Sequence, residues 1–302
     1  MKVLITGGLG FIGTGLEKAL TARGHTVTIF DRVRINRERY IRGDICDIYS
    51  LENAFEIVQP DVVVHFAAMV SRKESEETPF MAIQTNVDGT LNVGLLASAY
   101  NARLIYSGSS EEYGTAFYEQ DFVDEDTPFG HPTSIYSMTK RMSEEIVQYY
   151  ARFKGLTATT IRFFMLYGPG EVSSDYRSAM IRFIDAAQHG KPLTVHQGTS
   201  RQWCYIDDAI DAVVRIVERE QCEKYEAFNI GSEDVISTED LAYKILDMTG
   251  SQSKVNLIEV EETVIPIKHA NFDRALHVLG WKATTDLTDG IEKVCQRTRE
   301  GL

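Results

Sequence analysis

Residues 1–13 read MKVLITGGLGFIG, in which a short apolar run breaks into glycines after only six residues. The run predicts a buried strand, and the segment at 16–20 predicts a helix after the glycines. Gly8 is expected to allow a tight turn, Gly10 to let the backbone approach a pyrophosphate, and Gly13 to let helix and strand pack closely. Because the N-terminal N–H groups and the positive dipole end of the helix face this turn, the stretch predicts a dinucleotide site.

An acidic residue stands where such a site binds a ribose. Asp31 directly follows a strand predicted at 26–30, about 20 residues past the glycines, and can accept both ribose hydroxyls of NAD. A carboxylate repels the additional phosphate of NADP, although Arg32 and Arg34 leave that cofactor open because a guanidinium can hold a phosphate. Asp44, in GDICD, is expected either to hydrogen-bond the adenine amino group or to lie in a surface turn.

Strand-like and helix-like segments alternate through the first half of the chain. This alternation predicts a Rossmann-type doubly wound parallel sheet, an α/β fold with ligands at the carboxyl ends of its strands. We expect an NAD-binding domain at 1–168 and a smaller, interleaved C-terminal substrate domain at 169–302, where the pattern becomes mixed. A short apolar segment near 227–231 predicts a strand that returns to the main sheet.

Composition excludes several classes of function. The net charge of −13 repels phosphate backbones and anionic lipid, so neither nucleic acid nor a membrane is an expected partner. No apolar run approaches the about 20 residues of a membrane span. The four cysteines form no CxxC and the seven histidines no HxxxH or HExxH, which predicts a cytoplasmic protein with reduced thiols and without a metal site.

Tyr136 and Lys140 stand four residues apart in a helix predicted at 134–153, so both side chains lie on one face. The pKa of a tyrosine is near 10, and a neighbouring ammonium is expected to lower it so that Tyr136 can take a proton from a sugar hydroxyl. The spacing alone also fits a solvated helix face. The upstream SGSSEEYG at 107–114 favours catalysis, because it places Ser109 at a strand end where it can hydrogen-bond the same substrate oxygen.

These residues resemble the extended short-chain dehydrogenase/reductases, the group of NAD-dependent sugar epimerases and dehydratases. The resemblance covers nearly the full length of the chain. It rests on an ordered series of motifs, TGGLGFIG (6–13), GDICD (43–47), HFAA (65–68), TNVDGT (85–90), SGSSEEYG (107–114), YSMTK (136–140), RFFMLYGPGE (162–171), RQWCYIDD (201–208), NIGS (229–232) and LGW (279–281).

The resemblance implies a catalytic set of Ser109, Tyr136 and Lys140, and a contact of Arg201 with the diphosphate of a nucleotide sugar. The expected cofactor contacts are Gly7, Gly10, Phe11, Ile12, Gly13, Asp31, Asp44, Ile45, Ala67, Ala68, Asn86, Tyr136 and Lys140. The implied chemistry starts with hydride transfer from the sugar C4 to NAD, which gives a 4-keto sugar. The fate of that ketone separates epimerases, dehydratases and reductases.

Glu111 bears on that fate, because it matches the glutamate with which family dehydratases abstract the C5 proton. Ser110 stands where glucose-type dehydratases carry an acidic proton donor, and it is an expected substrate contact. The Ser-Ser-Glu run resembles mannose-type dehydratases and glucuronate decarboxylases, whereas GSSEEYG also resembles certain 4-keto-6-deoxymannose reductases. Glu111 is therefore expected either to act at C5 or to be a structural carboxylate.

Two departures from the family pattern lie on the substrate side. Met165 replaces the usual asparagine of RxFNxYGP, and the arginine of an RxGD-type segment is absent from 264–273. Lys268 or Arg177 is expected to supply the missing charge. The prediction of the cofactor is unaffected, and the identity of the sugar stays open.

Three hypotheses follow. The leading one is an NAD-dependent nucleotide-sugar epimerase/dehydratase that acts through transient oxidation at the sugar C4, with a nucleotide-diphosphate sugar as its partner. The second is an NAD(P)H-dependent 4-keto-sugar nucleotide reductase, and the third is a non-catalytic nucleotide-binding protein. Family analogy also implies a homodimer through the helices predicted at 86–100 and 134–153.

Overall fold

The computed structural model describes residues 1–299, which divide into two compact units. The first unit consists of 1–112, 134–162 and 210–228; the second consists of 113–133, 163–209 and the chain from 229 on. The chain therefore passes between the units several times, where the sequence predicts an interleaved boundary near residue 168 with one return strand near 227–231. Residues 210–228 belong with the first unit because Ile210 packs directly over Gly15, one turn into its first helix.

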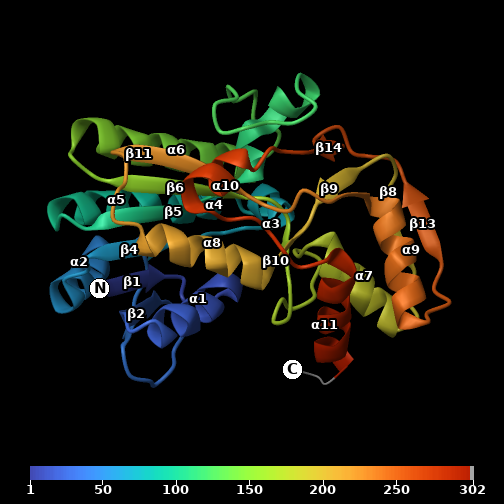
Figure 1. Ribbon diagram of the computed structural model, residues 1–302, viewed down its shortest axis with the longest axis horizontal. Coiled ribbons are helices and arrows are strands. Elements are labelled where there is room, and N and C mark those ends of the chain that lie inside the picture. The colour runs from blue at the N-terminus through green and yellow to red at the C-terminus, as the bar shows by residue number, and fades with distance from the viewer. Residues whose placement is uncertain (300–302) are drawn as a thin grey trace. The chain divides into compact units, whose positions relative to one another are not determined.

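A seven-stranded sheet carries the first unit, with the strand order β11-β6-β5-β4-β1-β2-β3 (Figure 1). The pairs β1–β2, β1–β4, β4–β5 and β2–β3 are parallel, and this sheet confirms the Rossmann-type α/β fold. Its strands are β1 (Lys2–Thr6), β2 (Thr26–Asp31), β3 (Tyr40–Arg42), β4 (Val62–His65), β5 (Arg103–Ser109), β6 (Ala158–Phe163) and β11 (Tyr225–Ile230). β11 occupies the place of the return strand expected near 227–231.

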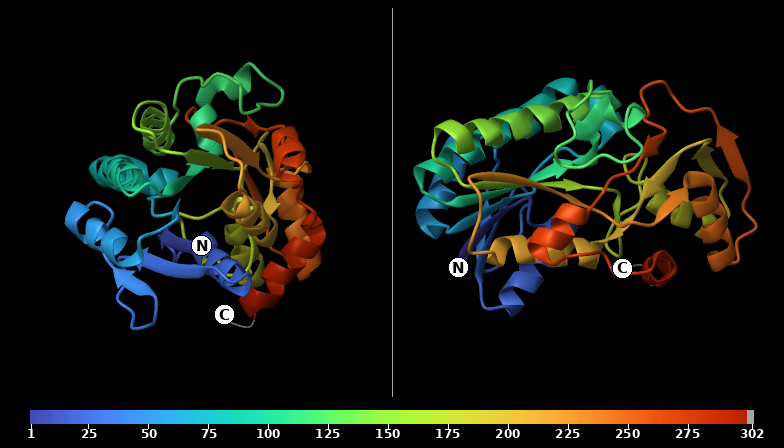
Figure 2. Two further views of the ribbon diagram at one scale, coloured as in Figure 1. Left: turned by 60° about the vertical axis from the view of Figure 1, so that its left-hand side comes forward. Right: turned by 45° about the horizontal axis from the view of Figure 1, so that its top comes forward.

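Helices cover both faces of this sheet (Figure 2). On one face, Leu4 and Val63 of the sheet pack against Phe55, Val93 and Val147 from three different helices, which forms the main hydrophobic core. The helices are α1 (Phe11–Ala22), α2 (Ile48–Val58), α3 (Arg72–Glu77), α4 (Pro79–Ile83), the π-helix η1 (Gln84–Asp88), α5 (Gly89–Ala99), α6 (Ile135–Phe153) and α8 (Ile206–Glu218). The helix expected at 86–100 thus starts inside a π-helical turn.

The second unit is built from short strands and helices around an aromatic core, in which Tyr113 packs against Phe117, Phe129 and Phe164. Its strands are β7 (Leu166–Tyr167), β8 (Leu193–His196), β9 (Ser200–Gln202), β10 (Cys204–Tyr205), β12 (Val235–Ser237), β13 (Val255–Ile258) and β14 (Ile267–Lys268). Its helices are α7 (Ala179–Gln188), α9 (Thr238–Thr249), α10 (Asp273–Leu279) and α11 (Leu287–Arg299), and the 3₁₀ segment η2 (Ser110–Tyr118) begins in the first unit.

The described part of the chain contains neither a helix suited to span a membrane nor a group of metal ligands. None of its helices is both long and apolar enough to cross a membrane. Within residues 1–299, no three His, Cys, Asp or Glu side chains gather as metal ligands would.

Candidate active site

The turn after β1 consists of glycines whose neighbours leave no room for a side chain. Gly7 has a φ of +67°, and a Cβ there would lie 2.5 Å from the backbone nitrogen of Ala67. A Cβ on Gly13 would lie 2.6 Å from the Cα atom of Gly8. The sequence predicts the tight turn at Gly8. The left-handed residue is Gly7 instead, so the chain reverses one residue earlier. α1 begins after Gly10 and has no side-chain cap, so its first N–H groups suit an anion.

Asp31 lies against this turn from the end of β2. Its carboxylate accepts the N–H of Leu9 in the turn at 3.1 Å and the N–H of Val33 at 3.2 Å. A negative charge is thus fixed beside the anion site, where a cofactor ribose would present its hydroxyls. Asp44 accepts the N–H of Cys46 at 2.9 Å in the turn before α2. That bond supports the turn role of Asp44 and leaves its contact with adenine a prediction.

Asn86 is buried in the π-helix η1, and the protein bonds both ends of its amide. Its Oδ1 accepts the N–H of Met69 at 2.8 Å, and its Nδ2 donates to Oγ1 of Thr139 at 2.9 Å. Asn86 therefore ties the segment after β4 to α6, which carries Tyr136 and Lys140. Its expected contact with the cofactor stays a prediction.

Most of the remaining expected cofactor residues lie at the glycine turn, and Ile45 lies against the start of α5. Phe11 and Ile12 form the first turn of α1, Ala67 packs on Gly7, Ala68 follows it, and Ile45 is buried against Gly89. The glycine cradle, the uncapped helix N-terminus and the Asp31 carboxylate are the features that NAD requires of its protein. The residues present fit NAD.

The catalytic set lies in the first unit, at the carboxyl end of β5 and on α6. Ser134 caps α6 by accepting the N–H of Ser137 at 3.0 Å, which starts the helix just before Tyr136. One turn later, the Nζ atom of Lys140 donates to the carbonyl oxygen of Ser107 at 2.5 Å. The Ser109 side chain lies close enough to Tyr136 to lower the pKa of its hydroxyl. The structure thus brings Ser109, Tyr136 and Lys140 together at one strand end.

Burial dominates the electrostatics of this set. It raises the pKa of Tyr136, against a lowering by the hydrogen bond from Ser109, and Glu111 and Glu112 raise it further. Burial also lowers the pKa of Lys140 to about 8, opposed by the neighbouring carboxylates Glu112 and Glu144. The expected lowering of the Tyr136 pKa by the ammonium is therefore wrong for the protein alone, because the cost of a buried phenolate is larger.

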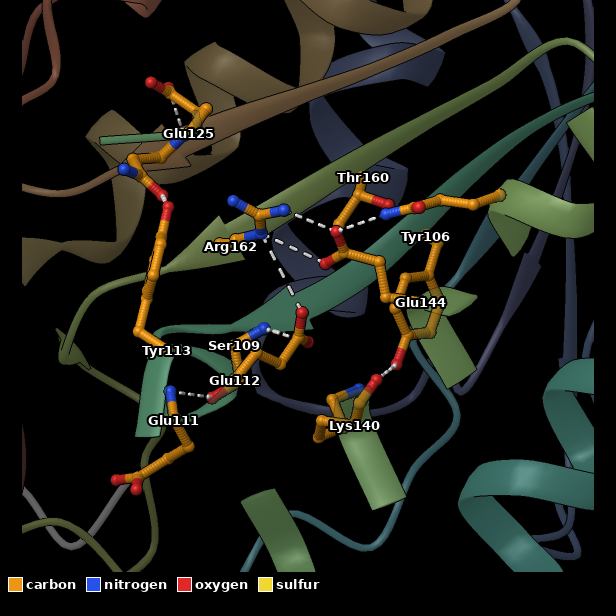
Figure 3. A network of polar contacts seen from close by, with 12 residues as sticks. Tyr106, Ser109, Glu111, Glu112, Tyr113, Glu125, Lys140, Glu144, Thr160 and Arg162 are labelled. Carbon is orange, nitrogen blue, oxygen red and sulfur yellow. Dashed lines mark hydrogen bonds and ion pairs between the residues drawn. The ribbon is translucent and has the colours of Figure 1, made fainter. Parts of the chain in front are cut away.

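Glu111 lies next to the catalytic set without joining the polar network behind it. Its N–H donates to Oγ of Ser109 at 3.2 Å, and its carbonyl oxygen accepts from Oγ of Ser137 at 2.9 Å. Its half-buried carboxylate points away from the network of Glu112 (Figure 3). It lies close enough to Tyr136 to raise the pKa of the tyrosine. The adjacent Ser110 is buried. A second acid–base group is therefore available at the site.

Sequence reasoning missed the polar network behind the catalytic set. Glu144 follows Lys140 by one helical turn, and both oxygens of its carboxylate accept from the guanidinium of Arg162 on β6. Glu112 lies 3.9 Å from the same guanidinium (Figure 3). The spacing of Tyr136, Lys140 and Glu144 at four-residue steps is the signal that could have revealed this face.

In the second unit, the structure pairs two of the expected substrate cations. Arg201 on β9 and Lys268 on β14 are register partners in a parallel ladder. The Arg201 guanidinium donates to the carbonyl oxygen of Ile265 at 2.9 Å and to that of Ser200 at 2.7 Å. Arg177 lies in an exposed segment before α7, outside this ladder.

Met165, the departure from the family asparagine, has a left-handed backbone with a φ of +33°. Its carbonyl oxygen accepts the N–H of Cys204 at 3.1 Å, which fixes the chain between β6 and β7. Asparagine tolerates this conformation better than an unbranched apolar side chain does. The left-handed backbone at residue 165 is therefore a reason for asparagine at this position that does not depend on a substrate contact.

Comparisons with known proteins agree with this geometry. Residues 3–231 match the model of the NAD dependent epimerase/dehydratase family. The chain is 31% identical to a UDP-N-acetyl-alpha-D-glucosaminuronate decarboxylase of Bacillus cytotoxicus, over 99% of this chain and 98% of that protein. It is 28% identical to UDP-glucuronate 4-epimerase 4 of Arabidopsis thaliana, over 97% of this chain and 74% of that protein. A solved UDP-glucuronic acid 4-epimerase from Bacillus cereus, in complex with UDP-glucuronic acid and NAD, superimposes with a TM-score of 0.90 at 25% identity, over 100% of both chains.

Proposed function

This chain belongs to the NAD-dependent epimerase/dehydratase family, and from that premise we propose that it oxidises C4 of a nucleoside-diphosphate hexuronic acid and releases the C6 carboxyl group as carbon dioxide. NAD is the cofactor and accepts the C4 hydride when bound. The proposal is supported by the buried Ser109–Tyr136–Lys140 set and by the Glu111 carboxylate beside it.

The residues divide the work at the sugar. Ser109 and Tyr136 hydrogen-bond the C4 oxygen, and Tyr136 takes its proton as the hydride leaves C4. The Lys140 ammonium favours the phenolate form of Tyr136, which is the form that accepts this proton. The C4 ketone makes the C6 carboxylate a β-keto acid, so the C5–C6 bond breaks, carbon dioxide leaves and its electron pair forms a C4–C5 enolate. A proton delivered to C5 restores the ketone, and Glu111 is the group we assign to that delivery. Return of the hydride to C4, with Tyr136 giving its proton back to the C4 oxygen, then completes the turnover, so that carbon dioxide is the only group lost.

Glu111 is the observation that carries the proposal. Epimerisation at C4 needs only removal and return of one hydride and one proton, which Tyr136 already serves. A carboxyl group beside Tyr136 is needed when a second proton moves, at C5. The relative with 31% identity is named as a decarboxylase of a UDP-linked uronic acid, which agrees with this assignment.

A second candidate is 4-epimerisation of the same class of substrate. It is favoured by the relatives named UDP-glucuronate 4-epimerases, which match 97% of this chain. Both candidates require a nucleoside-diphosphate uronic acid, and they differ in whether the carboxyl group survives the ketone stage.

Product masses from a panel of UDP-glucuronate, UDP-N-acetylglucosaminuronate and UDP-glucose, incubated with NAD, test the proposal. We expect loss of one carbon dioxide from a uronic acid and no reaction of UDP-glucose. An unchanged mass at a new retention time means epimerisation and overturns decarboxylation. Loss of water means dehydration and also overturns it.

A Glu111→Gln variant sharpens this experiment. If Glu111 delivers the C5 proton, the variant should still form the C4 ketone but incorporate solvent deuterium at C5 more slowly. Glu145→Gln, an exposed carboxylate on α6, is the matched control. Unchanged incorporation in Glu111→Gln would leave Glu111 a structural residue.

The position of Asp31 bears on the alternative of an NADPH-dependent reductase. Its carboxylate is anchored to the glycine turn through Leu9, where the 2′-phosphate of NADPH would meet a fixed negative charge. We expect NAD to bind more tightly than NADPH, and Asp31→Ala to reduce that preference. Tighter binding of NADPH by the unaltered protein would favour the reductase.

We assign the substrate diphosphate to Arg201 and Lys268. These cations share one ladder of the second unit, and Lys268 takes the place of the arginine that is absent from 264–273. Arg177 is the weaker candidate because it lies outside that ladder.

We also propose that the enzyme is a homodimer that pairs through α5 and α6. These helices pack side by side and expose several apolar side chains, namely Leu91, Leu95, Met142, Tyr149 and Phe153. Burial of such a surface is a favourable driving force for association. Sedimentation should give twice the chain mass, and Leu95→Glu with Phe153→Glu should give the monomer.

A location in the cytoplasm agrees with the free thiols of all four cysteines.

A further inference from the structure

The network behind the catalytic set contains two carboxyl groups and one guanidinium. Arg162 donates from Nε to Oε2 of Glu144 at 3.0 Å and from Nη2 to Oε1 at 2.5 Å. Its Nε atom lies 3.9 Å from Oε2 of Glu112, which is too far for a hydrogen bond. Both glutamate side chains have no exposed surface. The nearby Lys140 ammonium donates to the carbonyl oxygen of Ser107. The Arg162 guanidinium is therefore hydrogen-bonded to Glu144 and not to Glu112.

The two carboxyl groups also differ in their other partners. Glu144 accepts from Oη of Tyr225 at 2.8 Å and from Nε2 of Gln148 at 3.1 Å. Oε1 of Glu112 accepts the N–H of Ser109 at 2.8 Å, but Oε2 is fully buried and has no hydrogen-bond partner among the described residues. Both oxygens of Glu144 accept hydrogen bonds from protein groups, whereas only one oxygen of Glu112 does.

A proton on Glu112 would remove the unpaired buried acceptor and the repulsion between the two carboxylates. An ionised Glu112 would bury an acceptor without a donor next to a second carboxylate, and both effects are costly. Both carboxyl groups face the same Arg162 guanidinium, so a proton on Oε2 of Glu112 removes one of two neighbouring negative charges and makes that oxygen a donor towards Glu144.

The charged and titratable groups facing Glu112 support the same state. They come from three elements and are Glu144, Lys140 and Tyr136 on α6, Arg162 on β6 and Tyr106 on β5. Burial and the neighbouring Glu144 raise the pKa of Glu112 well above its usual range, more than Arg162 and Lys140 lower it. Burial also opposes ionisation of Glu144, but hydrogen bonds from Glu112 and Arg162 lower its pKa to about 2.

We propose that Glu112 is a protonated, neutral positioning residue, whose carboxyl group donates one hydrogen bond to Glu144 and accepts one from the N–H of Ser109. Its bond to the N–H of Ser109 fixes the end of β5 (Figure 3), and with it the Ser109 hydroxyl. Gly108 makes room for this carboxyl group, because a Cβ there would lie 3.0 Å from its Oε1 atom. The substrate contact of Ser109 rests on the proposed function, and the protonation of Glu112 does not.

Infrared spectroscopy of the intact protein at neutral pH, without substrate, tests the proton. We expect the carbonyl stretch of a protonated carboxyl group, with a shift in D2O, and its disappearance in Glu112→Gln. Glu145→Gln, which removes an exposed carboxylate from the same helix, should leave the band in place. A spectrum without the band, or a band that survives in Glu112→Gln, overturns the proposal whether or not the enzyme decarboxylates its substrate.

Steady-state kinetics test the positioning role. Glutamine keeps an acceptor for Ser109 and a donor for Glu144, so Glu112→Gln should retain kcat within about threefold and an unchanged pH profile. Glu112→Val removes both bonds, and its kcat should fall about tenfold or more at nearly constant KM, because the serine is displaced. Equal losses in both variants, at unfolding midpoints that confirm folding, would overturn this role. If the valine variant does not fold, the glutamine variant and the infrared band decide alone.

Discussion

The two units hold their functional groups in different ways. In the first unit, Tyr136 and Lys140 lie on one helix face and meet Ser109 at the end of a buried strand, where burial shifts the pKa of both ionisable groups. In the second unit, Arg201 and Lys268 meet only because two short strands from distant parts of the sequence pair. The first arrangement suits chemistry, which needs fixed and dry groups, and the second suits binding of a charged ligand. Substitutions should therefore reduce kcat in the first unit and raise KM in the second.

Tyr136→Phe should have the largest effect. It removes the group that takes the C4 proton, and kcat should fall about 10²- to 10⁴-fold while NAD still binds. Tyr149→Phe is the matched control, because it deletes the same hydroxyl from an exposed position on α6. Turnover on the substrate found in the product panel, with NAD affinity by calorimetry, gives both quantities.

Unchanged turnover in Tyr136→Phe would remove the tyrosine from the chemistry. Combined with an unreactive panel, that result would favour the third hypothesis, a non-catalytic nucleotide-binding protein.

Gly13→Ala should disrupt the cofactor cradle. Its Cβ would lie 2.6 Å from the Gly8 backbone, so the turn must shift, at a cost of about 1–3 kcal/mol in the free energy of unfolding. NAD affinity should fall with it. In the control Gly94→Ala, within α5, the added Cβ meets nothing nearer than 3.8 Å, and stability should be kept or rise. Chemical denaturation with and without NAD measures both effects, and equal behaviour of the two variants would contradict the cradle.

The sequence predicts the first unit better because its signals are local. The glycine turn, Asp31, Ser109 and the Tyr136–Lys140 spacing each lie within a few residues of the element that positions them, and the structure places them as expected at strand ends and on one helix face. What the local pattern cannot give is the electrostatic balance. Burial, which depends on the whole core, raises the pKa of Tyr136 more than its neighbours lower it.

Features that depend on long-range contacts could not be predicted. Within the π-helical turn, the Asn86 side chain bonds to Met69 and Thr139, and no periodicity reveals these contacts. The ladder between Arg201 and Lys268 likewise follows from the register of two very short strands. The division into units depends on long-range contacts too, such as the packing of Ile210 over Gly15 and the bonds of Arg103 to the carbonyl oxygens of Ile216 and Arg219.

Lys268→Met tests the second unit. If Lys268 supplies the charge of the absent arginine, KM for the nucleotide sugar should rise about tenfold at a similar kcat, the size of one charged hydrogen bond. Arg177→Met, in an exposed segment, should change KM little. The reverse ranking would assign the charge to Arg177, and a fall in kcat without a change in KM would contradict the contrast between the units.

The smallest effect expected is a pH dependence of stability from His65, in the first unit. Its ring lies between Oγ1 of Thr6 at 2.7 Å and Oγ1 of Thr90 at 3.1 Å. Burial, with a contribution from the Lys140 ammonium, lowers its pKa from 6.5 to about 3. Below pH 6.5 the unfolded chain therefore binds a proton that the folded protein does not, so stability falls as pH falls towards 3. Between pH 6.5 and 5.5 this amounts to about 1 kcal/mol.

Urea unfolding at several pH values measures this dependence. His65→Gln should flatten it by that amount, whatever the variant does to stability at neutral pH. Thr90→Val is the matched control, because it removes one hydrogen bond but keeps the buried ring, so it should lower stability and keep the slope. An unchanged slope in His65→Gln would mean that the ring is protonated inside the fold. That result would contradict the dry interior on which the contrast between the two units depends.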